Sequence, residues 1–330
     1  MKTYIYPTYT PSRDKSGNLY IKYFHDAFLH NKNFKVVNRF WQIGIASLFF
    51  NLDAQLLVVQ WVDLIPGKRL GKIQFVLYLM LILIAYLLRK KIVWILHNKH
   101  AHKGKSKLVD FGMKFMAKYA TCVIAHSEEG ISFFNTMYPR FSGKCCCVPH
   151  PVYSEEIYES QKIRYDYIIW GGINPHKQVA EFLHYANGSA FFKGKKILVC
   201  GRCKDPIYGE MIRKELNPNI TFVDEFISDD DLKKYIGQSR VILFTYNGDS
   251  VLSSGALIYS INFCKPIIGP NLGNFADENM KEIVSVYNTF DEIPRIALKN
   301  CTDACVKYIQ ENKWVDFPLK MKQKLEKKQR

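Results

Sequence analysis

The sequence predicts an α/β protein with two parallel sheets, one in each half of the chain. Short apolar runs of strand length recur along the sequence, and segments of helical length separate them. This alternation starts again after Pro149-His150-Pro151, which ends the first series. With 330 residues the chain is long enough for two domains. We therefore expect one domain over residues 1–155 and a second over residues 156–330.

In the first half, apolar runs without alternation suit strands that are buried on both faces of a parallel sheet. We predict strands at residues 3–6, 56–59, 91–96, 121–125 and 145–148. Apolar residues at helical spacing predict helices over residues 18–29, 73–88 and 110–119.

The second half shows the same pattern. We predict strands at residues 167–170, 196–200, 220–223, 240–244 and 266–269, the final clear strand, and helices over 176–185 and beginning near 228 and 255. Asp229, Asp230 and Asp231 suggest a metal-binding acidic motif, but Ser228 before them favours a capping box at a helix start. The basic segment from Lys320 to Arg330 is interpreted as a solvated helix, or as a final helix packing back on the N-terminal domain.

The positive charge is concentrated in the first half. Residues 1–155 hold 21 Lys and Arg against 8 Asp and Glu, a net charge of +13, whereas residues 156–330 hold 25 against 22, or +3. Such a half attracts phosphates in nucleic acid, in anionic lipid or in a lipid-linked diphosphate. The basic residues are scattered and match no nucleic-acid-binding motif. We therefore expect no nucleic-acid partner.

One apolar run raises the question of a membrane. Phe75 to Leu88 are 14 apolar residues, with two tyrosines counted, and Arg89-Lys90-Lys91 follow. A transmembrane helix needs about 20 residues. The run is therefore a buried core helix or a helix lying in the face of a bilayer. The N-terminus has no apolar core of the signal-peptide type, so we expect a cytoplasmic protein at the inner face of the membrane.

The nine cysteines include the adjacent Cys145, Cys146 and Cys147 and have no partner pairs with zinc-like spacing. We expect free thiols in a reducing compartment.

Two loops have the composition of phosphate-binding loops. Gly171 and Gly172 follow a predicted strand, where glycine lets backbone N–H groups approach an anion. Lys177, a few residues on, supplies a point charge. An ordinary glycine turn explains the same residues equally well.

The second loop contains Tyr246, Ser253, Ser254 and Gly255. Its hydroxyls and free N–H groups at a helix start suit a diphosphate. An ordinary serine N-cap is the alternative.

Taken together, IIWGGINPHKQ, KILVCGRC and SSGALIYSINFCKPIIGPNLG resemble the donor domain of GT-B glycosyltransferases of the family-4 type, which includes bacterial polysaccharide and capsule enzymes. Cys264 stands where glycine is usual. The resemblance covers residues 165 to about 280 well. It implies two Rossmann-like domains whose parallel sheets face each other across a cleft, which holds the active site.

The resemblance also implies site residues. Donor binding falls on Gly171, Gly172, Lys177, Arg202, Tyr246, Ser253, Ser254 and Gly255. Two glutamates common in the family align with Val251 and Tyr259, and Glu278 is the substitute candidate. By resemblance the reaction needs no metal or cofactor, and the substrate is a UDP- or GDP-sugar.

A histidine-rich loop follows the strand at residues 91–96. In the resembled family a strand-ending His-Asn pair lies near the sugar and the acceptor. This gives His97 a catalytic role and places Asn98 and His102 on the acceptor side. A solvated loop and a metal site are the alternatives. Gly17 and Asn18 in the N-terminal loop meet the donor phosphate or acceptor by resemblance, or form a plain turn.

The function expected is transfer of a hexose from a nucleotide sugar to a lipid-linked or saccharide acceptor. Family-4 enzymes retain the anomeric configuration, so we expect a retaining, metal-independent enzyme of surface polysaccharide synthesis. The expected partners are the nucleotide sugar, the acceptor and an anionic membrane surface with peripheral attachment. The alternatives are a non-catalytic sugar-nucleotide binder and a basic nucleic-acid-binding protein.

Overall fold

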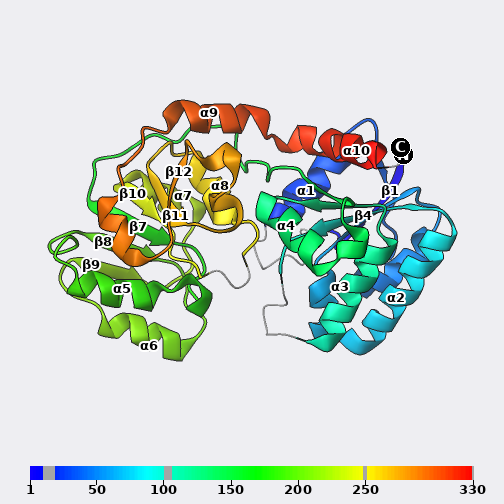
Figure 1. The fold of residues 1–330 in the computed structure, drawn as a ribbon, viewed down its shortest axis with the longest axis horizontal. Helices are drawn as coiled ribbons and strands as arrows, with labels where there is room; N and C mark the ends of the chain where they lie inside the picture. The colour runs from blue at the N-terminus through cyan, green and yellow to red at the C-terminus, as the bar shows by residue number, and fades with distance from the viewer. Residues whose placement is uncertain (10–18, 100–105, 248–250, 329–330) are drawn as a thin grey trace. The chain divides into compact units, whose positions relative to one another are not determined.

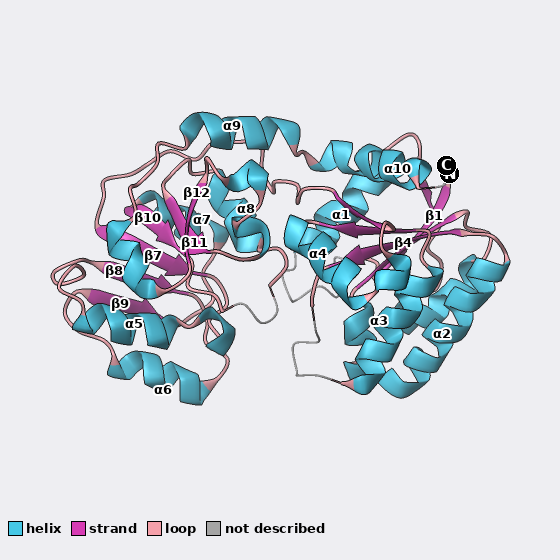
Figure 2. Ribbon diagram, in the orientation of Figure 1, coloured by secondary structure: helices cyan, strands magenta, loops and turns pink. Residues whose placement is uncertain are grey.

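The computed structural model describes residues 1–9, 19–99, 106–247 and 251–328 (Figure 1). The chain forms two compact units: unit 1 comprises Met1–Tyr153 and Asn312–Arg330, and unit 2 comprises Ser154–Glu311. Each unit is a parallel sheet with helices packed against it (Figure 2). The first segment of unit 1 ends close to the boundary expected at residue 155, and the unit also takes in the C-terminal segment.

Unit 1 is built on a six-stranded parallel sheet. Its strands are β1 (Lys2–Tyr6), β2 (Lys35–Val36), β3 (Leu56–Gln60), β4 (Lys91–Leu96), β5 (Cys122–Ala125) and β6 (Cys145–Cys147). They lie in the order β2-β1-β3-β4-β5-β6. The five strands predicted here are confirmed, and the two-residue edge strand β2 is too short for an apolar run to reveal it.

One face of this sheet is covered by α1 (Leu19–Leu29) and α10 (Phe317–Lys327). Phe317, Met321 and Leu325 of α10 are buried among strand residues such as Val58 and Ile124. The interpretation of this segment as a solvated helix is therefore wrong for one face. The basic residues that suggested it lie at the remaining positions of the helix, and its apolar face packs on the N-terminal sheet.

Further elements complete unit 1. They are η1 (Trp41–Asn51), η2 (Val62–Gly67), α2 (Gly71–Leu87), α3 (Lys107–Tyr119), α4 (Glu128–Met137), η3 (Pro139–Phe141) and η8 (Trp314–Asp316). The other face of the sheet packs on several of them. Trp94 of β4, for example, meets Phe134 of α4 at a ring-centroid distance of 6.2 Å.

The apolar run is the helix α2, 17 residues long. Phe75, Tyr78 and Ile82 are buried, so the core-helix interpretation holds for one face of it, whereas its other face is exposed. Among the residues that the structure describes, no helix is long and apolar enough to cross a membrane.

Unit 2 is a second six-stranded parallel sheet. Its strands are β7 (Tyr165–Trp170), β8 (Ile197–Cys200), β9 (Ile220–Val223), β10 (Ser239–Leu243), β11 (Ile267–Pro270) and β12 (Val284–Tyr287). Their order is β12-β11-β10-β7-β8-β9. Read from β9 to β12 and numbered from the first strand of the unit, this is the 3-2-1-4-5-6 order of dinucleotide-binding sheets. The predicted final strand is not the last, because β12 follows it.

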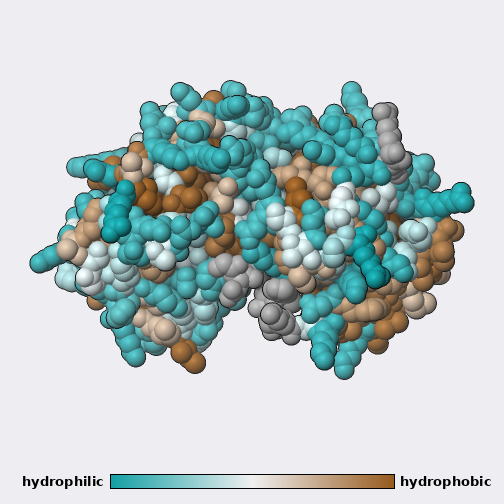
Figure 3. Space-filling model, viewed as in Figure 1, coloured by the Kyte–Doolittle hydropathy of each residue, from teal (hydrophilic) through white to brown (hydrophobic). Residues whose placement is uncertain are grey.

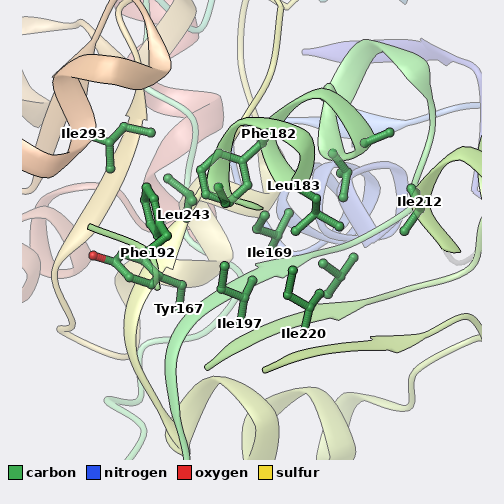
Figure 4. Packing of buried hydrophobic residues seen from close by; sticks show 14 of the residues in the cluster. Tyr167, Ile169, Phe182, Leu183, Phe192, Ile197, Ile212, Ile220, Leu243 and Ile293 are labelled. Atoms are coloured by element: carbon green, nitrogen blue, oxygen red, sulfur yellow. The ribbon is translucent and has the colours of Figure 1, made fainter. Parts of the chain in front are cut away.

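The helices of unit 2 are α5 (Val179–Gly188), α6 (Pro206–Lys214), α7 (Asp229–Gly237), α8 (Gly255–Ile261) and α9 (Thr302–Glu311). Short turns are η4 (Pro175–Lys177), η5 (Gly273–Phe275), η6 (Glu278–Met280) and η7 (Phe290–Arg295). Phe182 and Leu183 of α5 pack on Ile169 and Ile197 of the sheet (Figure 4). The helix predicted from residue 176 begins at Val179, because Gln178 before it has a φ of +48°.

Candidate functional site

The loops after β7 and β10 mark the point where strand order reverses in unit 2. β7 and β10 are neighbours, and the chain proceeds from them to opposite edges of the sheet. In open parallel sheets, ligands bind at the carboxyl ends of the strands at such a point. The two loops singled out in the sequence are the ones that follow these strands. Topology thus brings together residues about 80 positions apart.

Lys177 joins the two loops. Its Nζ donates a hydrogen bond to the carbonyl of Trp170 at 2.9 Å and lies 5.0 Å from the ring centroid of Tyr246. The Thr245 hydroxyl donates to the Lys177 carbonyl. An ammonium has three N–H donors, and within the described part of the chain only one of those on Lys177 has a hydrogen-bond acceptor. Two donors are therefore left for a ligand.

The loop after β10 ends at the N-cap of α8. Ser254 accepts a hydrogen bond from the backbone of Leu257 at 3.2 Å, so the N-cap interpretation of this serine is confirmed. Its hydroxyl lies 3.3 Å from that of Tyr246, and its backbone N–H donates to Oδ1 of Asn274 at 2.8 Å. Gly255 is the first residue of the helix.

Three buried polar atoms near this loop have no hydrogen-bond partner among the described residues. They are Ser253 Oγ, Asn274 Nδ2 and Asn247 Oδ1. The Asn274 side chain is 1 % exposed. A buried polar atom without a partner costs about 1–3 kcal/mol, so such atoms in one place point to a ligand or water. Asn274 was missed from the sequence because its position beyond β11 carries no phosphate-loop signature.

A third loop, after β8, packs against the glycine turn. Gly201 has a φ of +134°, and a Cβ there would lie 2.0 Å from the carbonyl oxygen of Gly171, whose own φ is +100°. The carbonyl of Arg202 accepts from the backbone of Ile173 at 3.0 Å. The Arg202 side chain is exposed at this edge of the sheet. Gly172 has open space around its Cβ position.

The two positions where the family has glutamates hold Val251, which is half-buried, and Tyr259, which is buried. The Tyr259 hydroxyl donates a hydrogen bond to Asp229 of α7 at 2.6 Å. This bond holds the Tyr259 side chain between α7 and its own helix, α8. Glu278 begins η6 with an exposed carboxylate paired to Lys281. Ser228 accepts from the backbone of Asp231 at 3.1 Å, so the capping interpretation of the acidic run is confirmed. Cys264 has a φ of +49°, which explains why glycine suits that position.

In unit 1 the strand order reverses between β1 and β3, and His97 lies beside the end of β3. Its Nε2 is 3.0 Å from Oε1 of Gln60, so Nε2 donates and Nδ1 keeps its lone pair. The ring stacks on Trp61, with centroids 4.1 Å apart and planes at 7°. Burial, followed by the nearby His126 and His150, lowers the pKa of His97 well below its usual range. His97 is therefore a neutral imidazole near pH 7.

Asn98 is buried, and its Nδ2 donates to Oδ2 of Asp63 at 2.9 Å. Asp63 follows β3 and was not singled out from the sequence. The signal that could have found it is an acidic residue directly after an apolar run. Gln60 is fully buried, and its Nε2 has no partner in the part of the chain described. Gly17, Asn18 and His102 lie outside the described residues.

Two more histidines line this edge. His126 Nδ1 donates to the carbonyl of Val148 at 2.8 Å, and its Nε2 accepts from the Tyr20 hydroxyl at 2.8 Å. Burial lowers the pKa of His126 to about 4 and that of His150 to about 3. Among the described residues, no group of three His, Cys, Asp or Glu side chains is arranged to hold a metal ion. The nine cysteines are all free thiols.

The fold of the chain matches that of several solved structures. HepE (Alr3699) of Anabaena, solved with UDP and glucose, superposes with a TM-score of 0.71 at 11% identity, covering 99% of this chain and 100% of its own. AviGT4, a glycosyltransferase involved in avilamycin A biosynthesis, superposes with a TM-score of 0.60 at 12% identity, covering 98% of this chain and 96% of its own. TarM superposes with a TM-score of 0.60 at 10% identity, covering 85% of this chain and 58% of its own. The GT-B fold predicted from the sequence is thereby confirmed.

No protein-family model matches the sequence, and neither does any curated protein. At such identities the likeness shows the fold alone.

Proposed function

We propose that this chain is a glycosyltransferase that takes a sugar from a nucleoside diphosphate donor held at the loops of unit 2. The observation that carries the proposal is the arrangement around Lys177. Its two unused N–H donors lie on a loop tied to the one that ends in Ser253 and Ser254. Both loops stand at the switch point of a nucleotide-binding type of sheet. HepE, which has the same fold, was solved with UDP-glucose.

The chemistry proposed for this site is stabilisation of the leaving diphosphate. Breaking the bond between sugar and phosphate leaves negative charge on the diphosphate, and fixed cations lower the barrier by stabilising that charge. Lys177 and the exposed Arg202 supply the cations, and Ser253 and Asn274 supply hydrogen bonds. With two cations in place we propose a reaction that needs no metal ion. A hexose from a UDP- or GDP-sugar is the proposed donor group.

The acceptor side is proposed to lie at the carboxyl edge of the sheet in unit 1. The neutral His97 offers the lone pair of Nδ1 to a hydroxyl group, while Gln60 and Trp61 fix its ring. We propose a lipid-linked or saccharide acceptor and retention of configuration. The basic first half supports action at the cytoplasmic face of an anionic membrane, in surface polysaccharide synthesis.

One observation favours a second function, a sugar-nucleotide binder without turnover. Tyr259 occupies the position of a family glutamate and is engaged with Asp229. In this case the donor would bind at the same loops and would not be cleaved.

The test measures release of nucleoside diphosphate from UDP-glucose and from a GDP-hexose, with and without lipid-linked and saccharide acceptors. Acceptor-dependent release that EDTA leaves unchanged supports the proposed enzyme. Tight binding of the donor with no release under any condition establishes the binder instead. Activity that EDTA abolishes and Mn²⁺ restores contradicts the metal-free mechanism.

A further inference from the structure

The exposed face of α2 is apolar along its whole length. Ile73, Val76, Met80, Leu83 and Leu87 follow one another at spacings of three and four residues, which places them on one side of a helix. Their side chains are between 36 % and 68 % exposed. The opposite side of the helix is buried in the unit. The exposed stripe therefore has no partner in the described part of unit 1.

Three exposed phenylalanines lie in or directly before η1, the element that packs beside α2. Phe40, Phe49 and Phe50 are 57 %, 62 % and 44 % exposed, and their rings form a cluster with centroids 4.7 Å and 5.4 Å apart. The kink of η1 at Gly44 meets α2 so closely that a Cβ there would lie 2.4 Å from Oε1 of Gln74. We call the five residues of the stripe and the three phenylalanines the α2 face. Brown, hydrophobic residues gather in this region of unit 1 in Figure 3.

Basic residues lie at both ends of the stripe. Arg69 and Lys72 stand at its start and Arg89 and Lys90 at its end, with Lys68 and Lys91 next to them. Residues 66–91 contain no acidic residue. Large exposed apolar patches mark sites where a protein meets a partner or a membrane.

We propose that the α2 face docks on an anionic lipid bilayer, with α2 lying in the plane of the interface and its apolar stripe among the acyl chains. The charges favour this occupant. Lipid headgroups of negative charge complement the basic ends of the helix, whereas a second copy of the chain would bring two such basic ends together. The inference deepens the membrane partner of the proposed function and does not depend on the nucleotide site.

Docking of this kind would bring unit 1, with its proposed acceptor side, to the surface where a lipid-linked acceptor lies. The same docking also determines how membrane binding depends on salt concentration. Basic residues alone give attachment that high salt releases. Inserted apolar side chains add binding that salt does not screen, so both contributions are needed for full attachment.

The test is flotation of the full chain with vesicles of phosphatidylcholine containing phosphatidylglycerol. The variant Ile73→Ser/Met80→Ser/Leu87→Ser is expected to partition at least about tenfold more weakly, because three apolar side chains leave the bilayer. The matched control is Ile207→Ser/Met211→Ser/Phe226→Ser, which removes three exposed apolar residues from unit 2 and is expected to bind like the wild type.

A second variant tests the charges. Arg69→Gln/Lys72→Gln/Arg89→Gln/Lys90→Gln is expected to lose binding by at least about tenfold, since each charge near an anionic surface contributes about 1 kcal/mol. The control changes four exposed lysines of unit 2 to Gln: Lys193, Lys214, Lys234 and Lys307.

Three results would overturn the proposal. One is equal binding to vesicles of phosphatidylcholine alone. Another is unchanged binding of the serine variant with acidic vesicles. The third is a dimer of the wild type in light scattering that the serine variant abolishes, which would make a second copy the occupant. UDP binding measured by calorimetry on the same proteins separates these outcomes from failure of the proposed transferase.

Discussion

The Nζ of Lys177 lies 5.0 Å from the ring centroid of Tyr246, although the two residues are 69 positions apart in the sequence. The ring limits where the ammonium can move, and the Trp170 carbonyl accepts one of its hydrogens. A cation fixed in this way is suited to stabilising charge that appears on a leaving group, because little reorganisation is needed during the reaction.

Replacing Lys177 by alanine is expected to slow transfer by ~30–1000-fold, the effect of removing about 2–4 kcal/mol of electrostatic stabilisation. The side chain is half-buried in a loop, so the fold is expected to survive. Steady-state kinetics with a nucleotide sugar measures the loss. Lys193→Ala, an exposed lysine of the same unit, is the control and is expected to behave as the wild type. A Lys177→Ala enzyme within threefold of wild type would remove this residue from the mechanism.

Asn274→Asp removes the Nδ2 donor of this side chain and keeps its oxygen acceptor. The carboxylate still accepts from the Ser254 backbone, but the Nδ2 donor is lost and a negative charge replaces it. The dissociation constant for UDP is expected to rise at least about tenfold, because a hydrogen bond to a charged group contributes about 1.5–3 kcal/mol. Calorimetry measures it, with Asn300→Asp, the same charge change at an exposed residue, as the control. Unchanged UDP affinity would show that the donor does not use Nδ2.

Gly201→Ala is expected to destabilise unit 2 by about 3 kcal/mol or more. The new Cβ would overlap the backbone oxygen of Gly171 at a φ that side chains rarely adopt, and backbone atoms cannot rotate away. Denaturant unfolding gives the change. Gly188→Ala, at the end of α5 with open space around it, is the control and is expected to change stability by no more than about 1 kcal/mol. Similar stability of the two variants would contradict the packing of the two loops.

The stability of unit 1 is expected to fall as the pH drops from about 6.5 toward 4. The pKa of His126 is lowered to about 4 and that of His150 to about 3, while in the unfolded chain both titrate near 6.5. Below 6.5 the unfolded state binds more protons than the folded state, so protonation favours unfolding. Each histidine contributes about 1.4 kcal/mol per pH unit in this range.

Unfolding free energies between pH 7 and pH 5 measure this slope. The double variant His126→Gln/His150→Gln is expected to be less stable at pH 7 but to have a much smaller slope. His184→Gln, whose side chain is 81 % exposed, is expected to leave the slope unchanged. An equal slope in the wild type and the double variant would mean that other groups cause the pH dependence.

Much of the fold was predictable from the sequence because parallel strands buried on both faces are continuous apolar runs. The strands at 56–59 and 91–96 were found in this way. β12 was missed because Ser285 interrupts its apolar residues, and η1 because its helical turns are broken at Gly44. The buried side of α10 was hidden among basic residues whose apolar neighbours recur only every third or fourth position.

The site was predictable only in part. Gly171 and Lys177 follow a strand and carry a phosphate-loop pattern, so sequence alone singled them out. Asn274 and Asp63 join the candidate site through contacts with residues distant in the sequence, and a single sequence does not show such contacts. The exposure of the α2 stripe was also not predictable, since an apolar run looks the same whether one side or all sides are buried.

We propose that the loops around Lys177 hold a nucleoside diphosphate sugar. A thermal-shift panel of UDP, GDP, ADP and their sugars tests it most directly, since a ligand of the folded state adds about 2.7 kcal/mol of stability at one hundred times its dissociation constant. One nucleoside diphosphate and its sugar are expected to raise the Tm of the wild type, and Lys177→Ala is expected to lose most of this shift. No shift with any of these ligands, or equal shifts in the wild type and Lys177→Ala, would contradict it.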